Sequence, residues 1–190
     1  MVKAIDVAQR IYDSLGWVDA WKLQKLTYYV QAWSLGWYGR PLFDGYFEAW
    51  VNGPVEPSLY QANKNNRESP KGTTIHGADS STLNEWQRAV VASVINYYAD
   101  FSSAALVEIT HSESPWIKAR GDMSPHDRSN APVLESEMKK FYAAQEVTSN
   151  DGPRRPFLTL AQPDSTEAAL VKLEMQAERW KGALALLAEK

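Results

Sequence analysis

The stretch DAWKLQKLTYYVQAWSLGW, residues 19–37, decides the fold of this chain. Its apolar side chains recur at steps of three and four residues, the spacing that lines one face of an α-helix, at Leu23, Leu26, Val30, Trp33 and Trp37. Aromatic residues on the neighbouring faces indicate a helix that is apolar around most of its circumference and therefore buried. Asp19 is suited to cap the start of this helix, and Gly39 to end it. We expect a central core helix that the rest of the chain covers.

The composition is that of an ordinary globular protein. The 190 residues are 44% hydrophobic and 23% charged, which is enough for one sizeable core. Eight Trp and nine Tyr are many for this length, and such residues both fill cores and anchor protein interfaces. The formal charge of −3 gives no broad attraction to nucleic acid, which is therefore not an expected partner. Short basic groups such as Lys22 and Lys25 are typical of a solvated surface.

Cysteine and long apolar runs are both missing from the sequence. Without cysteine there is neither a disulfide framework nor thiolate chemistry, which fits a reducing compartment. No apolar run approaches the roughly 20 residues that span a bilayer, and the first residues contain no signal-peptide core. We expect a cytoplasmic protein with no membrane partner.

Apolar periodicity and turn residues predict further helices and one β element. The helices are expected over 2–15, from Pro57 onward, over 82–101, over 102–109, over 114–120 and over 132–144. Residues 46–55, YFEAWVNGPV, gather β-forming residues around Asn52 and Gly53 and predict a short hairpin. Residues 63–81 are polar and predict a long exposed loop.

Two of these helices carry capping signals at their starts. Thr82 and Glu85 have the S/T-x-x-E spacing of a capping box. Ser114 precedes Pro115, and serine caps a helix whose first position tolerates proline. The side chains expected to face the core from the last helix are Leu134, Met138 and either Phe141 or Tyr142.

The sequence changes character at about residue 147. Residues 147–163 contain three prolines and predict a linker. Residues 164–190 predict an amphipathic helix with apolar residues at Leu170, Leu173, Ala177, Trp180, Leu184 and Leu187. Such a face either packs back onto its own domain or binds a partner or a second copy of the chain. The expected fold is mainly α: a compact helical domain of residues 1–146 with a small β-hairpin, then the linker and the C-terminal helix.

Candidate catalytic and metal-binding residues are few. The titratable residues His111, Glu113, Asp122, His126 and Asp127 lie within 17 residues of one another. They match no H-E-x-x-H pattern, so a metal hydrolase built on His111 and His126 is a less favoured function. Glycine-rich phosphate loops and nucleophile elbows are also missing. The sequence predicts no catalytic residue, no cofactor and no metal.

The residues around the predicted turn form a different kind of cluster. Gly53 and Pro54 fix the path of the backbone beside two large aromatic residues, Trp50 and Tyr60. One interpretation is a structural turn held against the core. The other is a rigid and partly exposed aromatic platform, which includes Asn52, for a protein partner.

Several blocks of sequence, taken in order, resemble a known family. They are Leu23–Leu26 with Tyr28, Gly39–Phe43, Glu48–Trp50, Gly53–Val55, Pro57–Tyr60 and Leu106–Arg120, with Thr110, His111, Pro115 and Trp116 as the recognisable positions of the last block. Over about residues 3–144 the chain resembles the Panacea domain, the family of the SocA-type antitoxins and of phage-associated GepA-like proteins.

The resemblance implies an α-helical domain with a small β element that works by binding another protein. Members of the family neutralise toxins of several unrelated kinds, often encoded beside them, and one branch delivers its toxin to a cellular protease. The resemblance therefore implies an antitoxin that binds a cognate protein toxin encoded by an adjacent gene. The alternatives are a proteolytic adaptor that also binds a cellular protease, and a phage- or prophage-encoded regulatory protein.

Three surfaces are candidates for partner binding. They comprise Trp50, Asn52, Pro54 and Tyr60 around the turn, the exposed side of Thr110, His111 and Trp116, and Leu173, Trp180 and Leu184 in the C-terminal helix. The sequence does not choose among the three, and a homodimer could use the third.

Overall fold

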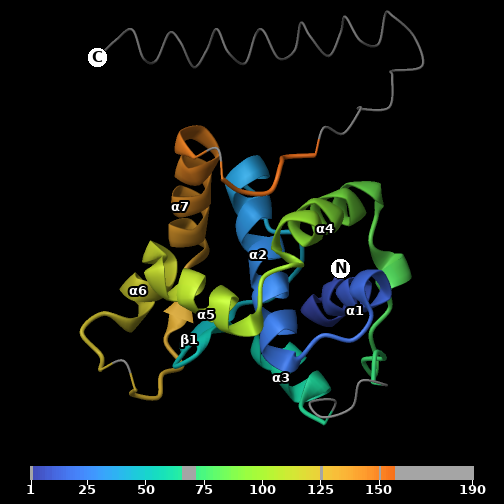
Figure 1. Cartoon of the computed structure of the whole chain (residues 1–190), viewed down its shortest axis with the longest axis horizontal. Coiled ribbons are helices and arrows are strands. Elements are labelled where there is room, and N and C mark those ends of the chain that lie inside the picture. Colours follow the sequence, from blue (N-terminus) through green and yellow to red (C-terminus); the bar gives the residue numbers. More distant parts are fainter. Residues whose placement is uncertain (1, 66–71, 125, 150, 157–190) are drawn as a thin grey trace, which may run out of the picture. The chain divides into compact units, whose positions relative to one another are not determined.

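The computed structural model describes residues 2–65, 72–124, 126–149 and 151–156. Within these residues the chain forms seven α-helices, a three-stranded antiparallel sheet and a 3₁₀ turn (Figure 1). The helices are α1 (Ala4–Leu15), α2 (Ala20–Tyr38), α3 (Pro57–Asn63), α4 (Glu85–Tyr98), α5 (Ser103–Ser112), α6 (Ser114–Arg120) and α7 (Glu135–Thr148). The strands are β1 (Phe47–Trp50), β2 (Gly53–Val55) and β3 (Pro132–Val133), and the 3₁₀ turn is Ser80–Thr82. The expected mainly α fold with a small β element is confirmed.

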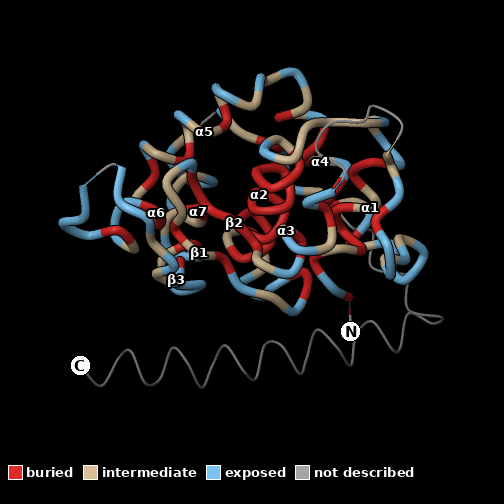
Figure 2. Tube along the Cα trace, turned by 90° about the horizontal axis from the view of Figure 1, so that it is seen from below, coloured by how far each residue is buried: buried red, intermediate tan, exposed pale blue. Residues whose placement is uncertain are grey.

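Helix α2 is the core of the fold, as its spacing predicts. The carboxylate of Asp19 caps its start by accepting hydrogen bonds from the N–H groups of Trp21 and Lys22, and Gly39 ends it in a left-handed conformation. Buried residues lie on every side of this helix, and Figure 2 shows it buried along most of its length. Helices α1, α4, α5 and α7 pack around it.

Helix α7 approaches α2 most closely. The approach requires a glycine at position 36, because a Cβ atom there would lie 2.7 Å from the Cβ atom of Tyr142. Around this contact the rings of Tyr29 and Trp33 lie edge-on to the ring of Tyr142, with centroid distances of 6.4 and 5.1 Å. Edge-to-face packing is a favourable arrangement for aromatic rings, so these residues join the two helices tightly.

The sheet has the strand order β2–β1–β3. Its β1–β2 hairpin is the one that the sequence predicts, but β3 is a correction. The sequence placed Pro132 and Val133 at the start of the last helix, whereas they pair with β1, with Val133 opposite Phe47. Proline suits an edge strand because it has no N–H group to donate, and Val133 buries its side chain.

The last helix therefore begins at Glu135, three residues later than predicted. Leu134 precedes the helix, and its side chain is 55% exposed, so the expectation that it faces the core is wrong. Met138 and Tyr142 are buried as expected.

The start of α4 also differs from the prediction. Its capping box forms between Asn84 and Gln87, not between Thr82 and Glu85. Thr82 belongs to the 3₁₀ turn, and its hydroxyl donates a hydrogen bond to the carbonyl of Asp79. Because the threonine side chain already has this partner, the next good capping residue along the chain begins the helix.

Part of the polar stretch predicted as an exposed loop is held against α1. Ile75 is buried, and its N–H group donates a hydrogen bond to Gln9 Oε1 at 2.8 Å. Gln9 Nε2 in turn donates to the carbonyl of Thr73 at 2.9 Å. The expectation of a wholly exposed loop is wrong here, because the buried side chain of Ile75 and the hydrogen bonds to Gln9 hold this segment against α1.

Helix α6 starts with Ser114 as its first residue, so the predicted capping role of Ser114 is wrong. Glu113 occupies the cap position and turns into the core, where its carboxylate accepts hydrogen bonds from the hydroxyls of Tyr142 at 2.6 Å and Tyr29 at 3.4 Å. Burial raises the pKa of Glu113 to about 7, although these two hydrogen bonds act in the opposite direction.

Residues 151–156 lie at the beginning of the predicted linker and contact α2 and α4. The hydroxyl of Tyr38 donates a hydrogen bond to the carbonyl of Pro156 at 2.9 Å, and the hydroxyl of Tyr97 donates one to the carboxylate of Asp151 at 2.5 Å. These contacts hold the chain against the helices immediately after α7.

The predicted C-terminal helix over 164–190 lies outside the described residues, and so do Leu173, Trp180 and Leu184. The partner-binding face that they form stays a prediction, as do the boundaries of the predicted domain, linker and helix.

In the part of the chain that the structure describes, no single helix has both the length and the apolar composition needed to cross a membrane. Helices α4 and α5 meet these criteria only when taken together, and they are bent by 103° at the break between them.

Candidate functional site

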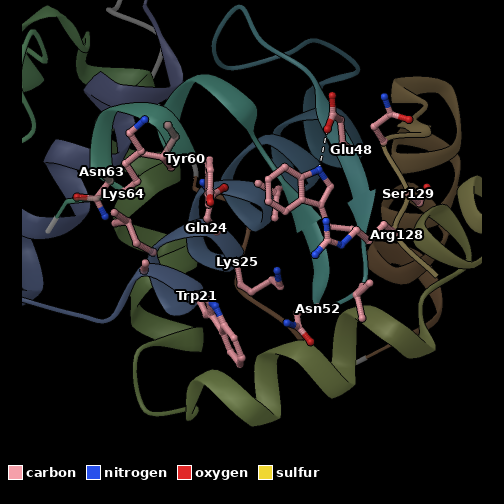
Figure 3. A pocket seen from close by; sticks show the side chains of 17 residues that line it. Trp21, Gln24, Lys25, Glu48, Asn52, Tyr60, Asn63, Lys64, Arg128 and Ser129 are labelled. Carbon is pink, nitrogen blue, oxygen red and sulfur yellow. Dashed lines mark hydrogen bonds between the residues drawn. The ribbon is translucent and has the colours of Figure 1, made fainter. Parts of the chain in front are cut away.

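A pocket of about 710 Å³ opens beside the start of α2 (Figure 3). Its walls come from α2, the β1–β2 hairpin, α3 and residues 128–130. Trp50, Asn52 and Tyr60, three of the predicted partner contacts, line it, while Pro54 is buried in the hairpin behind them. The structure therefore brings the residues of the predicted aromatic platform together at one cavity.

Side chains of α2 hold the outer edge of the hairpin in place. The Gln24 side chain accepts a hydrogen bond from the N–H group of Glu56 at 2.9 Å and donates one to its carbonyl at 3.2 Å. Lys25 Nζ donates to the carbonyl of Pro54 at 2.9 Å. Strand β2 is at the edge of the described sheet, so these two side chains supply the hydrogen bonds that a neighbouring strand would supply.

Gly53 lets the hairpin come this close to α2. Its φ of +92° lies in the region that favours glycine. A Cβ atom at this position would lie 2.6 Å from Lys25 Cε and 2.7 Å from Thr110 Oγ1. The predicted Asn-Gly turn is thus also a packing contact that joins the hairpin to α2 and α5.

Lys25 is a buried lysine on the wall of the pocket. Its side chain is 1% exposed, and among the described residues no carboxylate pairs with it. Removal from water lowers the pKa of Lys25 to about 7. Figure 3 shows Lys25 between Trp21 and Asn52. The expectation that Lys25 is a solvated surface residue is therefore wrong, because the hairpin and α3 cover this face of α2.

Two aromatic side chains of the pocket, Trp50 and Tyr60, pack against each other. The ring centroids of Trp50 and Tyr60 are 4.9 Å apart in an edge-to-face arrangement. Trp50 Nε1 donates a hydrogen bond to the Glu48 carboxylate at 2.7 Å, the dashed line in Figure 3. Trp21, which faces the same pocket from α2, is 53% exposed. Rings fixed before binding lose little entropy when a partner packs on them.

The second predicted surface lies directly behind the hairpin. Trp116 Nε1 donates a hydrogen bond to the carbonyl of Trp50 at 3.1 Å, and the ring of His111 stacks on that of Trp116 at 4.1 Å. Thr110 and Trp116 are buried and His111 is half-buried, so the expectation of an exposed side is wrong for the first two. Their contacts support the hairpin from behind, and a partner-binding role for them stays a prediction.

The surroundings of the His111 imidazole favour its neutral form. Burial and the nearby charge of Lys25 lower its pKa, against a hydrogen bond with the backbone of Val51 that raises it, and Arg120 adds a smaller lowering effect. Its Nε2 atom is buried and has no hydrogen-bond partner within the described residues.

Arg120 ties the same region together, although no sequence pattern points to it. Its guanidinium donates hydrogen bonds to the carbonyl of Ala49 at 3.2 Å and to the carbonyls of Ser124 and Asp127 at 2.7 and 2.9 Å. It also lies over the ring of Trp116, 5.1 Å from the centroid. One side chain thus joins α6, β1 and the loop that leads to the pocket residues 128–130.

The described residues contain no group of three or more His, Cys, Asp or Glu side chains that could hold a metal ion. His126 is exposed, whereas the ring of His111 packs against Trp116. The structure does not bring these two histidines into a common ligand group.

Comparison with known proteins identifies the family. Residues 23–117 match the family model described as Antitoxin SocA-like, Panacea domain, and this segment is half of the 190-residue chain. The chain belongs to the Panacea domain family. The Panacea segment runs from the start of α2 into α6, so it contains the hairpin, α3 and Lys25, while Trp21 and residues 128–130 lie outside it.

One curated relative is Antitoxin SocA of Caulobacter vibrioides (strain NA1000 / CB15N). The two chains are 51% identical over 39 residues, which are 20% of this chain and 21% of the relative. The match therefore spans about a fifth of the length of that protein. No solved structure matches the chain.

Proposed function

We propose that this Panacea-domain protein is an antitoxin that neutralises a cognate protein toxin by binding it directly. Family membership supports the antitoxin role. Direct binding is supported above all by one observation. Family blocks that are far apart in the sequence, around Lys25, Gly53 and Trp116, pack into a single assembly that presents a pocket with ordered aromatic walls.

The physical character of this assembly suits protein recognition. Large apolar rings beside polar side chains are the usual anchors of protein interfaces, and preorganised side chains bind with a smaller entropy cost. Neutralisation by such contacts needs no catalytic group, cofactor or metal. We propose that the partner is encoded by an adjacent gene and that the pocket residues Trp50, Asn52 and Tyr60 contact it.

Co-expression with the product of the neighbouring gene tests this function. The neighbour alone should arrest growth, the pair should grow, and the two proteins should purify as a stable complex. A neighbour that is harmless alone would remove the main support for an antitoxin.

The same experiment separates neutralisation from proteolytic delivery. Direct neutralisation leaves the half-life of the toxin unchanged or lengthens it. If growth returns without a stable complex and the toxin half-life falls, the protein is an adaptor, and neutralisation by binding alone is wrong.

A further inference from the structure

The charge of the pocket is opposite in sign to that of the chain. Two exposed cations, Lys64 and Arg128, the buried amine of Lys25 and one anion, Glu48, are among the described residues that line it, whereas the formal charge of the whole chain is −3. The carboxylate of Glu48 already accepts a hydrogen bond from Trp50 Nε1. A pocket with this balance attracts an anionic group, and its low-dielectric walls strengthen the attraction.

Lys25 in particular can hold a further partner. An ammonium group has three N–H donors, and the described hydrogen bonds of Lys25 use one of them, on the carbonyl of Pro54. A cation that is buried without a counter-ion is unfavourable, and an incoming carboxylate would supply the missing charge. Arg128 and Lys64 are exposed and line the same pocket, and they add positive charge on its solvent side, although Lys64 Nζ also donates a hydrogen bond to Gln61 Oε1 at 2.9 Å.

Apolar surface lies immediately beside these cations. The rings of Trp21, Trp50 and Tyr60 line the same cavity as Lys25. A cavity of about 710 Å³ has room for two or more amino-acid side chains. The ligand that satisfies both parts of the cavity therefore carries a carboxylate next to an apolar group.

We propose that the pocket binds a segment of the partner protein in which an Asp or Glu side chain lies next to an apolar one. The carboxylate takes its place by Lys25, between the charges of Lys64 and Arg128, and the apolar side chain packs against the tryptophan rings. This inference rests on the proposed function, because it takes the partner to be a protein toxin, and it adds the chemistry by which the toxin is recognised.

Nucleic acid is a poorer occupant than an acidic peptide. A polynucleotide is held by a track of cations that follow successive phosphates. Here the two exposed cations come from separate segments, Lys64 directly after α3 and Arg128 in the loop of residues 128–130, and the chain as a whole is acidic. The pocket suits one or two carboxylates rather than a run of phosphates.

An array of short random peptides, probed with the full-length protein, tests the recognition without knowledge of the toxin. Bound peptides are expected to be enriched in Asp or Glu adjacent to an apolar residue. Changing that acidic residue to Asn or Gln should weaken each peptide at least tenfold. Bound peptides with no acidic preference would overturn the proposal.

Three variants of the full chain locate the site. Lys25→Met should lose at least tenfold in affinity for the acidic peptides, and Arg128→Gln should lose a few-fold. Lys22→Met is the matched control, since Lys22 lies on the same helix, does not line the pocket and bonds the carbonyl of Ala99. Its affinity should stay within about twofold of the native chain. Equal losses in Lys22→Met and Lys25→Met would contradict the site.

The same variants also test whether the chain folds and whether the pocket binds nucleic acid. Lys25→Met removes a buried charge and keeps the length of the side chain, so its thermal unfolding should remain cooperative. If the unfolding of Lys25→Met is not cooperative, Arg128→Gln tests the site instead, because Arg128 is exposed. Unchanged peptide affinity in Arg128→Gln overturns the proposal. Binding of a single-stranded DNA oligonucleotide that is lost in Lys25→Met would assign the pocket to nucleic acid instead.

Growth assays keep the two proposals distinguishable. Acidic-peptide binding without rescue from any neighbouring toxin would leave the pocket assignment standing and overturn the antitoxin function. Rescue that is as strong with Lys25→Met and Arg128→Gln as with the native chain would support the antitoxin and overturn the pocket assignment.

Discussion

Glu113 is a carboxyl group that the fold removes from water, and this makes stability depend on pH. The unfolded chain releases its proton near the ordinary pKa of 4.5, whereas the folded chain holds the proton up to about 7. The free energy of unfolding therefore falls as the pH rises through this window. Glu113→Gln has no such proton, so above neutral pH it should be more stable than the native chain by roughly 1–3 kcal/mol.

Chemical denaturation at about pH 8 and at about pH 4 measures this difference, which should disappear at the lower pH. Glu108→Gln is the control, because Glu108 lies exposed on α5. A gain in the free energy of unfolding of Glu113→Gln that is the same at both pH values would show that packing, and not ionisation, causes the gain.

Gly53→Ala tests the close approach of the hairpin to α2. The new Cβ atom would meet Lys25 Cε and Thr110 Oγ1 at 2.6 and 2.7 Å, in a backbone conformation that alanine disfavours. We expect a loss of roughly 2–4 kcal/mol in the free energy of unfolding, and weaker partner binding. Gly77→Ala separates the steric clash from the backbone strain, since the φ of Gly77 is +77° but no atom lies within 4 Å of its Cβ position. The Gly77→Ala control should lose about 1 kcal/mol in the free energy of unfolding. An equal loss at both sites would rule out the steric clash as the cause.

Gln24 acts at the scale of the secondary-structure element, because it connects α2 to the hairpin. Gln24→Leu leaves the N–H group of Glu56 without its described partner, while the Glu56 carbonyl keeps its hydrogen bond from the N–H group of Tyr60, and the change should cost roughly 1–3 kcal/mol. Hydrogen exchange locates the effect: the amide of Glu56 should lose protection, while those of Leu42 and Phe43 keep theirs. Gln31→Leu should do the reverse, because Gln31 accepts hydrogen bonds from the N–H groups of Leu42 and Phe43. Uniform loss of protection in either variant would show general unfolding.

Local signals explain which elements could be predicted. The boundaries of α2 follow from Asp19 and Gly39, whose effects depend on a few neighbouring residues. Asn84 and Thr82 are both acceptable caps, and the 3₁₀ turn engages the Thr82 hydroxyl on the carbonyl of Asp79, which leaves Asn84 as the cap. Strand β3 has two residues, and it exists because β1 offers an open edge to Pro132 and Val133. No short-range pattern in the sequence reports that edge.

At the scale of the molecule, the pocket could be predicted in its residues but not in its geometry. Family resemblance picked out the blocks around Lys25, Trp50 and Trp116, yet nothing in their spacing says that they meet. The burial of Lys25 was missed because a lysine next to apolar residues is usually exposed. Arg120 was missed because its hydrogen-bond partners are backbone carbonyls, which carry no sequence signal.

Removal of residues 157–190 tests which predicted surface binds the partner. The described walls of the pocket come from residues 20–130, so a chain that ends at Pro156 should bind and neutralise the toxin within about threefold of the full chain. Calorimetric titration and the growth assay measure this. A loss beyond tenfold would place the main anchor on the face of Leu173, Trp180 and Leu184, which the truncation removes.

The way in which α2 holds the hairpin has a consequence for how such a protein can diversify. Gln24 and Lys25 bond the N–H and carbonyl groups of Glu56 and the carbonyl of Pro54, and every amino acid except proline presents both of these main-chain groups. The side chains that face the pocket at positions 50, 52 and 60 are therefore free to change without loss of these anchoring bonds. A new toxin could be accommodated by substitutions on a frame that stays intact, much as loops vary on an immunoglobulin scaffold.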